Sequence, residues 1–285
     1  VTASLCNTLP LLAVRRENLT QVLGCIRSLL PSSHNEPGQK STGACATGLR
    51  VLCALWQVQD CVFPLLHAEL EVCGNILDAR LDRKGSEDAS LRLSVAATLK
   101  VVCDCKPSRG IDILPIALRI LQRDSATSCP FVTAHCLDCL RHLISQGFLP
   151  FTQTWQWVSK QCSHAIQRTA HVAVTTSIVE LVALSANLKQ LGVSGVDMEE
   201  HCRPYMRTLW ALATHTDGKV RARAFAALSN FPAPLLVSSV PDAAKSNGGD
   251  NESIITWSSQ LLQDILSEQN VDAKTAGCAC VIHAA

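Results

Sequence analysis

The sequence carries almost no excess charge and has no segment that reads as a β-strand. Its 285 residues include 25 Lys and Arg and 24 Asp and Glu, which gives a formal net charge of +1 at pH 7. Polyanions attract proteins through an excess of positive charge, so we expect no direct binding of nucleic acid. No stretch with two-residue alternation is long enough to predict a sheet. The predicted fold class is therefore all-α.

The sequence also shows no signal peptide, transit peptide or membrane span. The longest apolar run, at 168–191, is interrupted by Glu180 and by scattered Thr and Ser. We therefore predict a buried helix there and no membrane insertion in this segment. The chain starts at Val1 rather than Met, and its last predicted helix runs to Ala285 without a cap. From this we expect a fragment of a longer protein.

Cysteine, in contrast, is abundant. The chain has 15 cysteines, and Cys25, Cys53, Cys73 and Cys103 lie within apolar helical runs. A chain of this length with 47% hydrophobic residues needs no disulfide staples. We predict reduced thiols that pack as small hydrophobic groups.

One stretch, DGKVRARAFAALSNF at 217–231, predicts how the helices pack. Asp217 can cap a helix, and Val220 and Arg221 fill the next turn. Ala224, Ala227 and Leu228 then form an apolar stripe whose small residues let two helices approach closely. This is the pattern of the inner helix of a HEAT repeat, in which an Asp and an Arg near the turn can form hydrogen bonds between stacked repeats.

The same pattern recurs in register at Asp88. Leu91 and Arg92 match Val220 and Arg221, and the stripe continues through Val95, Thr98 and Leu99. Weaker stripes occur around residues 45–49, 133–137 and 175–179, about 40 to 50 residues apart, which is near the period of HEAT and armadillo helix pairs. We predict an α-solenoid, an armadillo/HEAT-type superhelix of antiparallel helix pairs. It forms a single array over 1–285, with flexible loops near 31–41, 78–88 and 232–252.

Helical periodicity and the breaks at Pro and Gly divide the chain into candidate helices. Their predicted ranges are 5–13, 19–30, 43–57, 62–77, 89–104, 111–122, 131–145, 152–165, 168–191, 198–214, 217–231, 253–267 and 271–285.

One cluster on the predicted helix 131–145 has residue types that bind metals. His135, Cys139 and His142 fall within a wedge of roughly 60° at about 100° per residue, which could hold a zinc ion. The opposite side carries the apolar stripe, and no second Cys or His pair has metal-site spacing. Ordinary helix surface, facing solvent or a neighbouring helix, is therefore the favoured interpretation, and we expect no metal and no other cofactor.

A second cluster is basic. Arg203, Arg207, Lys219, Arg221 and Arg223 could form a patch across two helices. An RNA site would interleave such residues with stacking aromatic rings. The nearby aromatics are Tyr205 and Trp210, and we predict that the tryptophans, including Trp56, Trp155 and Trp157, fill the core. Hydrogen bonds within the fold and solvated side chains are the favoured role of the basic residues.

Two short stretches resemble catalytic motifs incompletely. Gly192, Ser194 and Gly195 lack the spacing and the preceding strand of a nucleophile elbow. Gly38, Lys40 and Ser41 lack the upstream glycine and the strand of a phosphate-binding loop. We predict that the chain is not an enzyme and has no catalytic residue.

Two longer strings resemble a known family. LRVLCALWQVQDCVFPLL at 49–66 and MRTLWALATHTDGKVRARAFAALSNFPA at 206–233 are similar to the N-terminal helical-repeat region of the focadhesin family. TLPLL at 8–12 precedes the first string in the matching order. The resemblance covers most of the chain.

The resemblance implies a non-enzymatic scaffold for protein–protein interaction, cytoplasmic and associated with focal adhesions and vinculin. It also implies a second possibility, an adaptor that stabilises the superkiller RNA-surveillance complex. A spacer with no binding site of its own is a third. The family supplies no binding residue to transfer to this chain.

Overall fold

The computed structural model describes most of the chain, namely residues 8–27, 29–30, 42–79, 86–124, 129–162, 171–186, 198–239, 265 and 271–284. Within these ranges the regular structure is helical, without a strand, which confirms the all-α prediction. The chain divides into two compact units, Val1–Phe148 and Leu149–Ala285.

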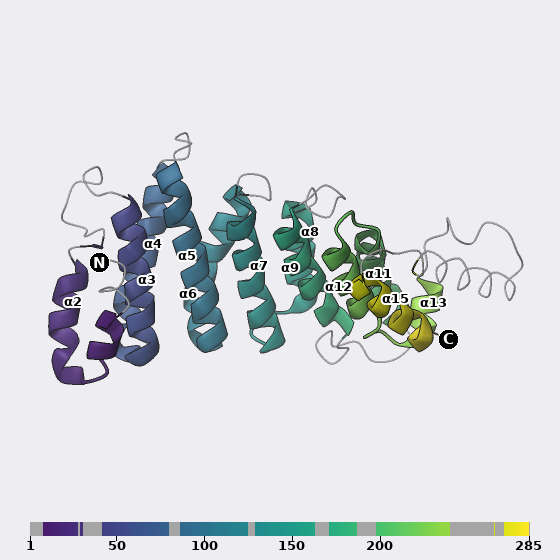
Figure 1. Ribbon diagram of the computed structural model, residues 1–285, viewed down its shortest axis with the longest axis horizontal. Helices are drawn as coiled ribbons and strands as arrows, with labels where there is room; N and C mark the ends of the chain where they lie inside the picture. Colours follow the sequence, from purple (N-terminus) through teal and green to yellow (C-terminus); the bar gives the residue numbers. More distant parts are fainter. Residues whose placement is uncertain are drawn as a thin grey trace, which may run out of the picture. The chain divides into compact units, whose positions relative to one another are not determined.

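Unit 1 consists of helices that alternate in direction (Figure 1). A helical turn at 8–12 comes first. It is followed by η1 (Arg16–Asn18), α2 (Leu19–Arg27), α3 (Thr42–Val58), η2 (Asp60–Val62), α4 (Phe63–Ala79), α5 (Ser86–Cys105), α6 (Pro107–Asp124) and α7 (Pro130–Ser145).

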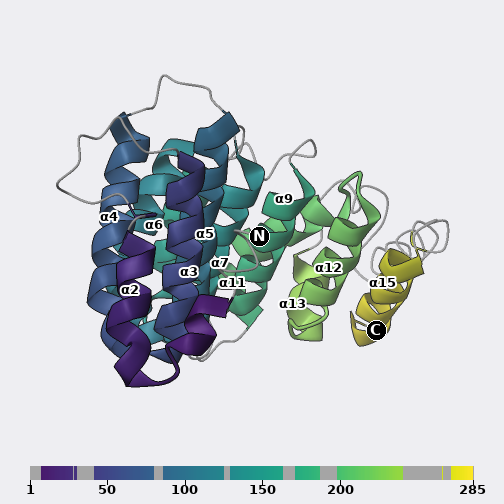
Figure 2. The same ribbon diagram turned by 60° about the vertical axis from the view of Figure 1, so that its left-hand side comes forward.

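Two layers make up unit 1. In one layer α3 packs on α5 and α5 packs on α7, and in the other α4 packs on α6 (Figure 2). Apolar side chains from both layers are fully buried between them, among them Leu52, Leu66, Leu99 and Ile116. Burying such side chains is the main driving force for the packing.

Unit 2 repeats this plan. Its elements are α8 (Phe151–Gln161), α9 (Val172–Ala183), η4 (Leu184–Ala186), α11 (Met198–Ala213), α12 (Gly218–Leu228), α13 (Ala233–Ser238) and α15 (Val271–Ala284). Helix α12 packs on both α9 and α15. Tyr205 of α11 meets Phe151 and Trp155 of α8 edge to face, with ring centroids 5.1 and 6.3 Å apart. Such aromatic pairs add to the stabilisation from burial.

Proline lies at the helix breaks that the sequence predicted, although α6 begins at Pro107, four residues before the predicted start at 111. Pro107 and Pro130 are the first residues of α6 and α7, and Pro150 precedes α8. Pro64 is the second residue of α4, where a missing backbone N–H costs no helical hydrogen bond. These positions confirm the predicted breaks.

Several predicted boundaries are wrong. The loop near 78–88 is shorter than expected, because α4 includes Asp78 and α5 begins at Ser86. The range 232–252 contains helix α13. Of the helix expected at 168–191, α9 and η4 cover 172–186, and residues 168–170 and 187–191 lie outside the described residues. The loop at 31–41 and the helix at 253–267, apart from Ile265, lie outside the described residues.

The cysteine prediction is mostly confirmed. No disulfide joins the described cysteines, and Cys53, Cys73 and Cys103 are buried. Burial raises the pKa of the Cys53 and Cys73 thiols to about 12, so both stay protonated at neutral pH. Cys25 is the exception: it is exposed on α2 and does not pack as a core residue.

Candidate functional site: polar contacts between successive helices

The turn that leads into α12 is closed by the two polar residues that the sequence singled out. The Asp217 carboxylate accepts hydrogen bonds from the backbone N–H groups of Lys219 and Val220, at 2.8 and 3.3 Å. Arg221 Nη1 donates to the carbonyl oxygens of His215 and Thr216, at 2.7 and 2.8 Å. Asp217 is thus a helix cap as predicted. These Asp and Arg bonds, however, lie within one turn, whereas we expected them to join stacked repeats.

The apolar stripe of α12 is buried. Val220, Ala224 and Leu228 are 0% exposed and Ala227 is 4% exposed. Helix α12 packs there against α9, α11 and α15. The stripe predicted from spacing alone is therefore a packing face.

Enlarging one of the two alanines of this stripe is expected to destabilise unit 2. Ala224→Leu adds three carbons at a fully buried position, and overpacking of that kind costs about 1 to 3 kcal/mol. Thermal unfolding followed by circular dichroism measures the change. The same substitution at the exposed Ala226 serves as the control and is expected to leave the melting temperature nearly unchanged. Equal melting temperatures for both variants would contradict the packing role.

The second copy of the pattern, on α5, is buried in the same way. Leu91, Val95 and Leu99 are 0% exposed, and Thr98 is 3% exposed. Asp88 differs from Asp217, because α5 already begins at Ser86 and Asp88 is its third residue. Asp88 is 7% exposed and lies inside the helix rather than at its cap position. Both helices therefore have the buried stripe, but only α12 has an Asp at its N-cap.

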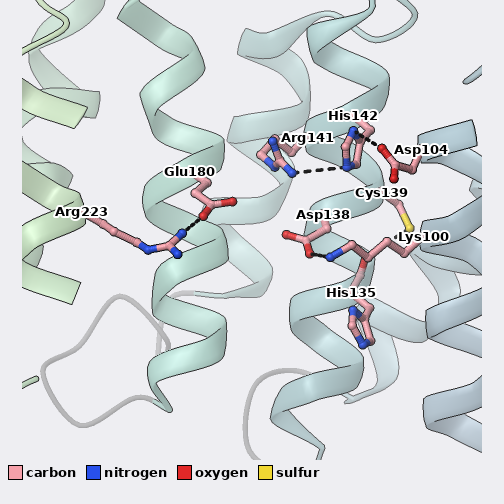
Figure 3. Close-up of polar contacts among 9 residues, drawn as sticks. All are labelled: Lys100, Asp104, His135, Asp138, Cys139, Arg141, His142, Glu180 and Arg223. Carbon is pink, nitrogen blue, oxygen red and sulfur yellow. Dashed lines mark hydrogen bonds and ion pairs between the residues drawn. The ribbon is translucent and has the colours of Figure 1, made fainter. Parts of the chain in front are cut away.

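Polar side chains join successive helices of the α3–α5–α7 layer. Arg50 Nε of α3 donates to Ser94 Oγ of α5 at 2.8 Å, across 44 residues. Lys100 Nζ of α5 forms an ion pair with Asp138 Oδ2 of α7 at 2.5 Å, across 38 residues (Figure 3). Asp138 is buried, so its charged hydrogen bond from Lys100 satisfies the carboxylate within the fold and joins α5 to α7.

The other layer of unit 1 has its own polar network. Arg119 of α6 donates to Glu71 and Asn75 of α4 at 3.2 and 3.1 Å. Arg123 pairs with Asp78 at 2.5 Å, and its side chain is only 10% exposed. The acceptors lie at i, i+4 and i+7 on α4, and the two arginines lie four residues apart on α6. The α4 face therefore presents a row of hydrogen-bond acceptors to the two arginines of α6.

The three candidate metal ligands on α7, which we expected to bind no metal, do not converge on one point. The Cys139 thiol is fully buried, donates to the His135 carbonyl oxygen at 3.1 Å and lies within hydrogen-bonding reach of the Cys103 thiol on α5. His142 lies between Asp104 and Arg141, at 3.5 Å from the carboxylate and 3.3 Å from the guanidinium (Figure 3). Burial raises the pKa of the Cys139 thiol well above 9.0, which opposes the thiolate that a metal would need.

Across the described residues, no group of three or more His, Cys, Asp and Glu side chains has a geometry that could hold a metal ion. Of the two expected surroundings, solvent and a neighbouring helix, Cys139 has the second: it is 0% exposed and lies against Cys103 of α5. Helix α7 is therefore buried on two sides. Its predicted core face is buried too, as Thr133, Leu137, Leu140 and Ile144 show.

The two histidines of α7 are expected to make stability depend on pH. Burial is the larger cause that lowers the pKa of His135, and the charge of Lys100 adds to it. Burial is also the larger cause that lowers the pKa of His142, and the charge of Arg141 adds to it. A lowered pKa in the folded state contributes stability above the unfolded value of 6.5, and that stability is lost as pH falls through the folded pKa. The nearby carboxylates, Asp138 and Asp104, oppose the shifts but do not reverse them.

We therefore expect the melting temperature to fall between about pH 7.5 and pH 5.5, and to fall less in a His135→Gln/His142→Gln variant. His67→Gln is the control, since the His67 ring bonds at the surface to the Asp112 carbonyl oxygen. A double variant with the same pH dependence as the wild type would show that these rings do not carry the effect.

The predicted basic patch is divided among different roles. Arg223 forms an ion pair with Glu180 of α9 (Figure 3), and Arg221 is held by the turn carbonyls described above. Arg203, Arg207 and Lys219 are exposed. Tyr205 and Trp210, the nearby aromatics, are only 5% and 7% exposed. Neither ring is available for stacking on a nucleic-acid base.

The tryptophans mostly fill the core, as predicted. Trp56 is 1% and Trp155 is 6% exposed, whereas Trp157 is half-buried. Trp210 Nε1 donates to Ser239 Oγ at 3.1 Å, so the polar tip of a buried ring is also satisfied.

The two stretches that resemble catalytic motifs, 192–195 and 38–41, lie outside the described residues. Among the helices that the structure describes, none combines the length and apolarity needed to cross a membrane.

Comparison with known proteins identifies the family. The family model described as Focadhesin/RST1, DUF3730, matches residues 1–228. The chain is 26% identical over 239 residues to the protein named Focadhesin from Danio rerio, a match that covers 80% of this chain and 12% of that protein. The chain thus spans a small part of the length of this curated relative. Because the family model matches well over half of the sequence, the chain belongs to the Focadhesin/RST1 family.

Proposed function

We propose that the chain is a section of a non-enzymatic scaffold, built as a single armadillo/HEAT-type helical array over 1–285, that holds protein partners together. The observation that carries this proposal is that the same helix packing recurs along the chain. Buried stripes on α5 and α12, and polar contacts between helices at separations of 38 to 48 residues, repeat one packing unit along the chain. Repeated helix pairs build extended surfaces, and such surfaces suit protein binding.

The chemistry of the polar residues supports a structural role for them. Lys100, Arg119, Arg123 and Arg223 each pair with a carboxylate on a neighbouring helix. In these ion pairs the four basic side chains hold one helix against the next. Partner binding is then left to side chains that stay exposed at turns and helix ends. We propose a cytoplasmic location at focal adhesions on the strength of the family.

The test is capture of binding proteins from cytosol by the 285-residue chain at low and high salt, with identification by mass spectrometry. A protein scaffold is expected to retain its partners at high salt. Focal-adhesion proteins such as vinculin among them would support the proposed location, and RNA-surveillance proteins of the superkiller complex would support the adaptor role instead.

Two results would contradict the scaffold. Capture that disappears after ribonuclease treatment, or that weakens steeply with salt, would indicate contacts to phosphate groups. If no protein is enriched, the chain is a spacer. The Leu228→Ala variant is a matched control: loss of its packing should reduce capture only as far as it unfolds the chain.

A further inference from the structure

Two buried thiols face each other between α5 and α7. Cys103 of α5 is 2% exposed and Cys139 of α7 is 0% exposed, and the two thiols lie within hydrogen-bonding reach of each other. In Figure 3 the sulfur of Cys139 points toward the helix that carries Lys100 and Asp104, which is α5. The packing thus brings together two cysteines from separate helices.

The contacts of Gly110 place the same side chains together independently. A Cβ added at Gly110 of α6 would lie 3.0 Å from Cys103 Sγ and 2.8 Å from Leu143 Cδ2. Leu143 lies one helical turn after Cys139 on α7, so both residues are on the same face of that helix. Cys103 and this face of α7 therefore meet beneath the first turn of α6, residues 107–110.

The backbone of this first turn covers Cys103. Gly110 has no side chain, so main-chain atoms lie over the Cys103 sulfur at this point. The N–H groups in the first turn of a helix have no partner within the helix, and helix ends open more readily than helix centres. A small oxidant therefore reaches Cys103 when residues 107–110 open, without unfolding of the whole unit.

Asp60, in η2 between α3 and α4, holds this turn in place. Its Oδ1 forms an ion pair with Lys106 Nζ at 2.8 Å, and its Oδ2 lies 3.9 Å from Arg109 Nη2. Lys106 also lies over the Trp56 ring and Arg109 over the Phe63 ring, at 5.8 and 4.7 Å from the ring centroids. Exposed ion pairs of this kind are weak, so they limit how often the turn opens but do not keep it permanently closed.

We propose that Cys103 and Cys139 are a redox-sensitive pair that hydrogen peroxide converts to a disulfide, which locks α5 to α7, and that the turn held by Asp60 controls access to the pair. This redox pair goes beyond the scaffold function and does not depend on it.

The reaction balances with hydrogen peroxide as the oxidant. The Cys103 sulfur attacks one peroxide oxygen, the O–O bond breaks, and a sulfenic acid and one water form. The Cys139 sulfur then attacks the sulfenic sulfur, the S–S bond forms, and the hydroxyl group leaves with the thiol proton as a second water. The two thiols lose two electrons together, and the peroxide is reduced to water. Burial raises the pKa of Cys139, and for this reason the first step is assigned to Cys103.

The test treats the intact 285-residue chain with hydrogen peroxide, blocks the remaining thiols with N-ethylmaleimide and locates cross-linked peptides by tandem mass spectrometry. We expect a cross-link between Cys103 and Cys139 within one molecule, reversed by dithiothreitol. The melting temperature should rise by about 5 to 15 °C on oxidation, and Cys139→Ala should abolish the rise. Cys105→Ser is the matched control: Cys105 is exposed and accepts a bond from Gln57, so its replacement should leave the cross-link in place.

Asp60→Asn tests the control of access. Asparagine keeps an oxygen for the bond from Trp56 Nε1, at 3.2 Å, but loses the charge that holds Lys106 and Arg109. We expect the cross-link to form about three to ten times faster in this variant. Glu71→Gln is the control, since it removes an ion pair to Arg119 further along α6 and should leave the rate unchanged.

Several results would overturn the redox pair. One is cross-links that join only other cysteines or separate molecules, and another is oxidation of Cys103 to a sulfinic acid without a cross-link. A cross-link that forms only at urea concentrations that unfold the chain would also contradict it. If Asp60→Asn and the wild type react at the same rate, the turn held by Asp60 does not control access.

Discussion

Leu228→Ala is expected to lower the free energy of unfolding of unit 2 by about 2 to 5 kcal/mol. Leu228 is 0% exposed and ends the stripe of α12, which packs against three other helices of the unit. Its truncation removes apolar contacts and leaves a cavity, and both effects destabilise the folded state. Urea unfolding monitored by circular dichroism measures the change.

The equivalent residue on α5 offers a matched comparison. Leu99 holds the same place in its stripe and is also 0% exposed, so Leu99→Ala should destabilise unit 1 by a similar amount. Val271→Ala, at a residue that is 75% exposed, should change little. A loss below about 1 kcal/mol for Leu228→Ala would mean that the stripe is not a packing face.

Gly110→Leu is expected to destabilise unit 1 by about 1 to 3 kcal/mol. A Cβ at position 110 would lie 2.8 Å from Leu143 Cδ2 and 3.0 Å from Cys103 Sγ, so neither α5 nor α7 leaves room for a side chain. Replacing a helical glycine normally stabilises a helix by about 0.5 to 1 kcal/mol, and this gain opposes the loss.

Gly24→Leu isolates that helix-forming gain. Gly24 is exposed on α2, and a Cβ there would meet nothing within 4 Å. The melting temperature should therefore rise slightly or stay the same for Gly24→Leu and fall for Gly110→Leu. A rise in both variants would show that α6 can move away from its neighbours at little cost.

Periodicity alone was enough to locate most helices and the buried stripes. Leu91, Val95 and Leu99 on α5, and Val220, Ala224 and Leu228 on α12, are buried as their spacing predicted. Local composition misled at α13, where Pro and Ser suggested a loop. A short helix forms there instead, and the buried Ser239 that follows it accepts a bond from Trp210.

Interactions between residues far apart in the sequence explain the other differences. Asp78 looked like part of a charged loop, but its partners Arg119 and Arg123 are more than 40 residues away on α6. The helical spacing of Glu71, Asn75 and Asp78 on α4, and of the two arginines on α6, is a sequence signal that indicates such a contact between the two helices. For Cys139, a single-helix projection left solvent and a neighbouring helix as alternatives, and the packing of α5 on α7 decides between them.

The exposure of single apolar residues could not have been predicted from the sequence. Leu12, Ile111 and Phe148 each look like ordinary core residues in their own stretch of sequence. Their exposure of 41% or more is a property of the fold.

The most direct test of the scaffold is a binding isotherm between the purified 285-residue chain and its most abundant captured protein, measured at low and high salt after ribonuclease treatment. A scaffold predicts saturation at a fixed stoichiometry, with an affinity that changes by less than about tenfold between the two salt concentrations. Binding that fails to saturate, or that is lost with ribonuclease or at high salt, would contradict it.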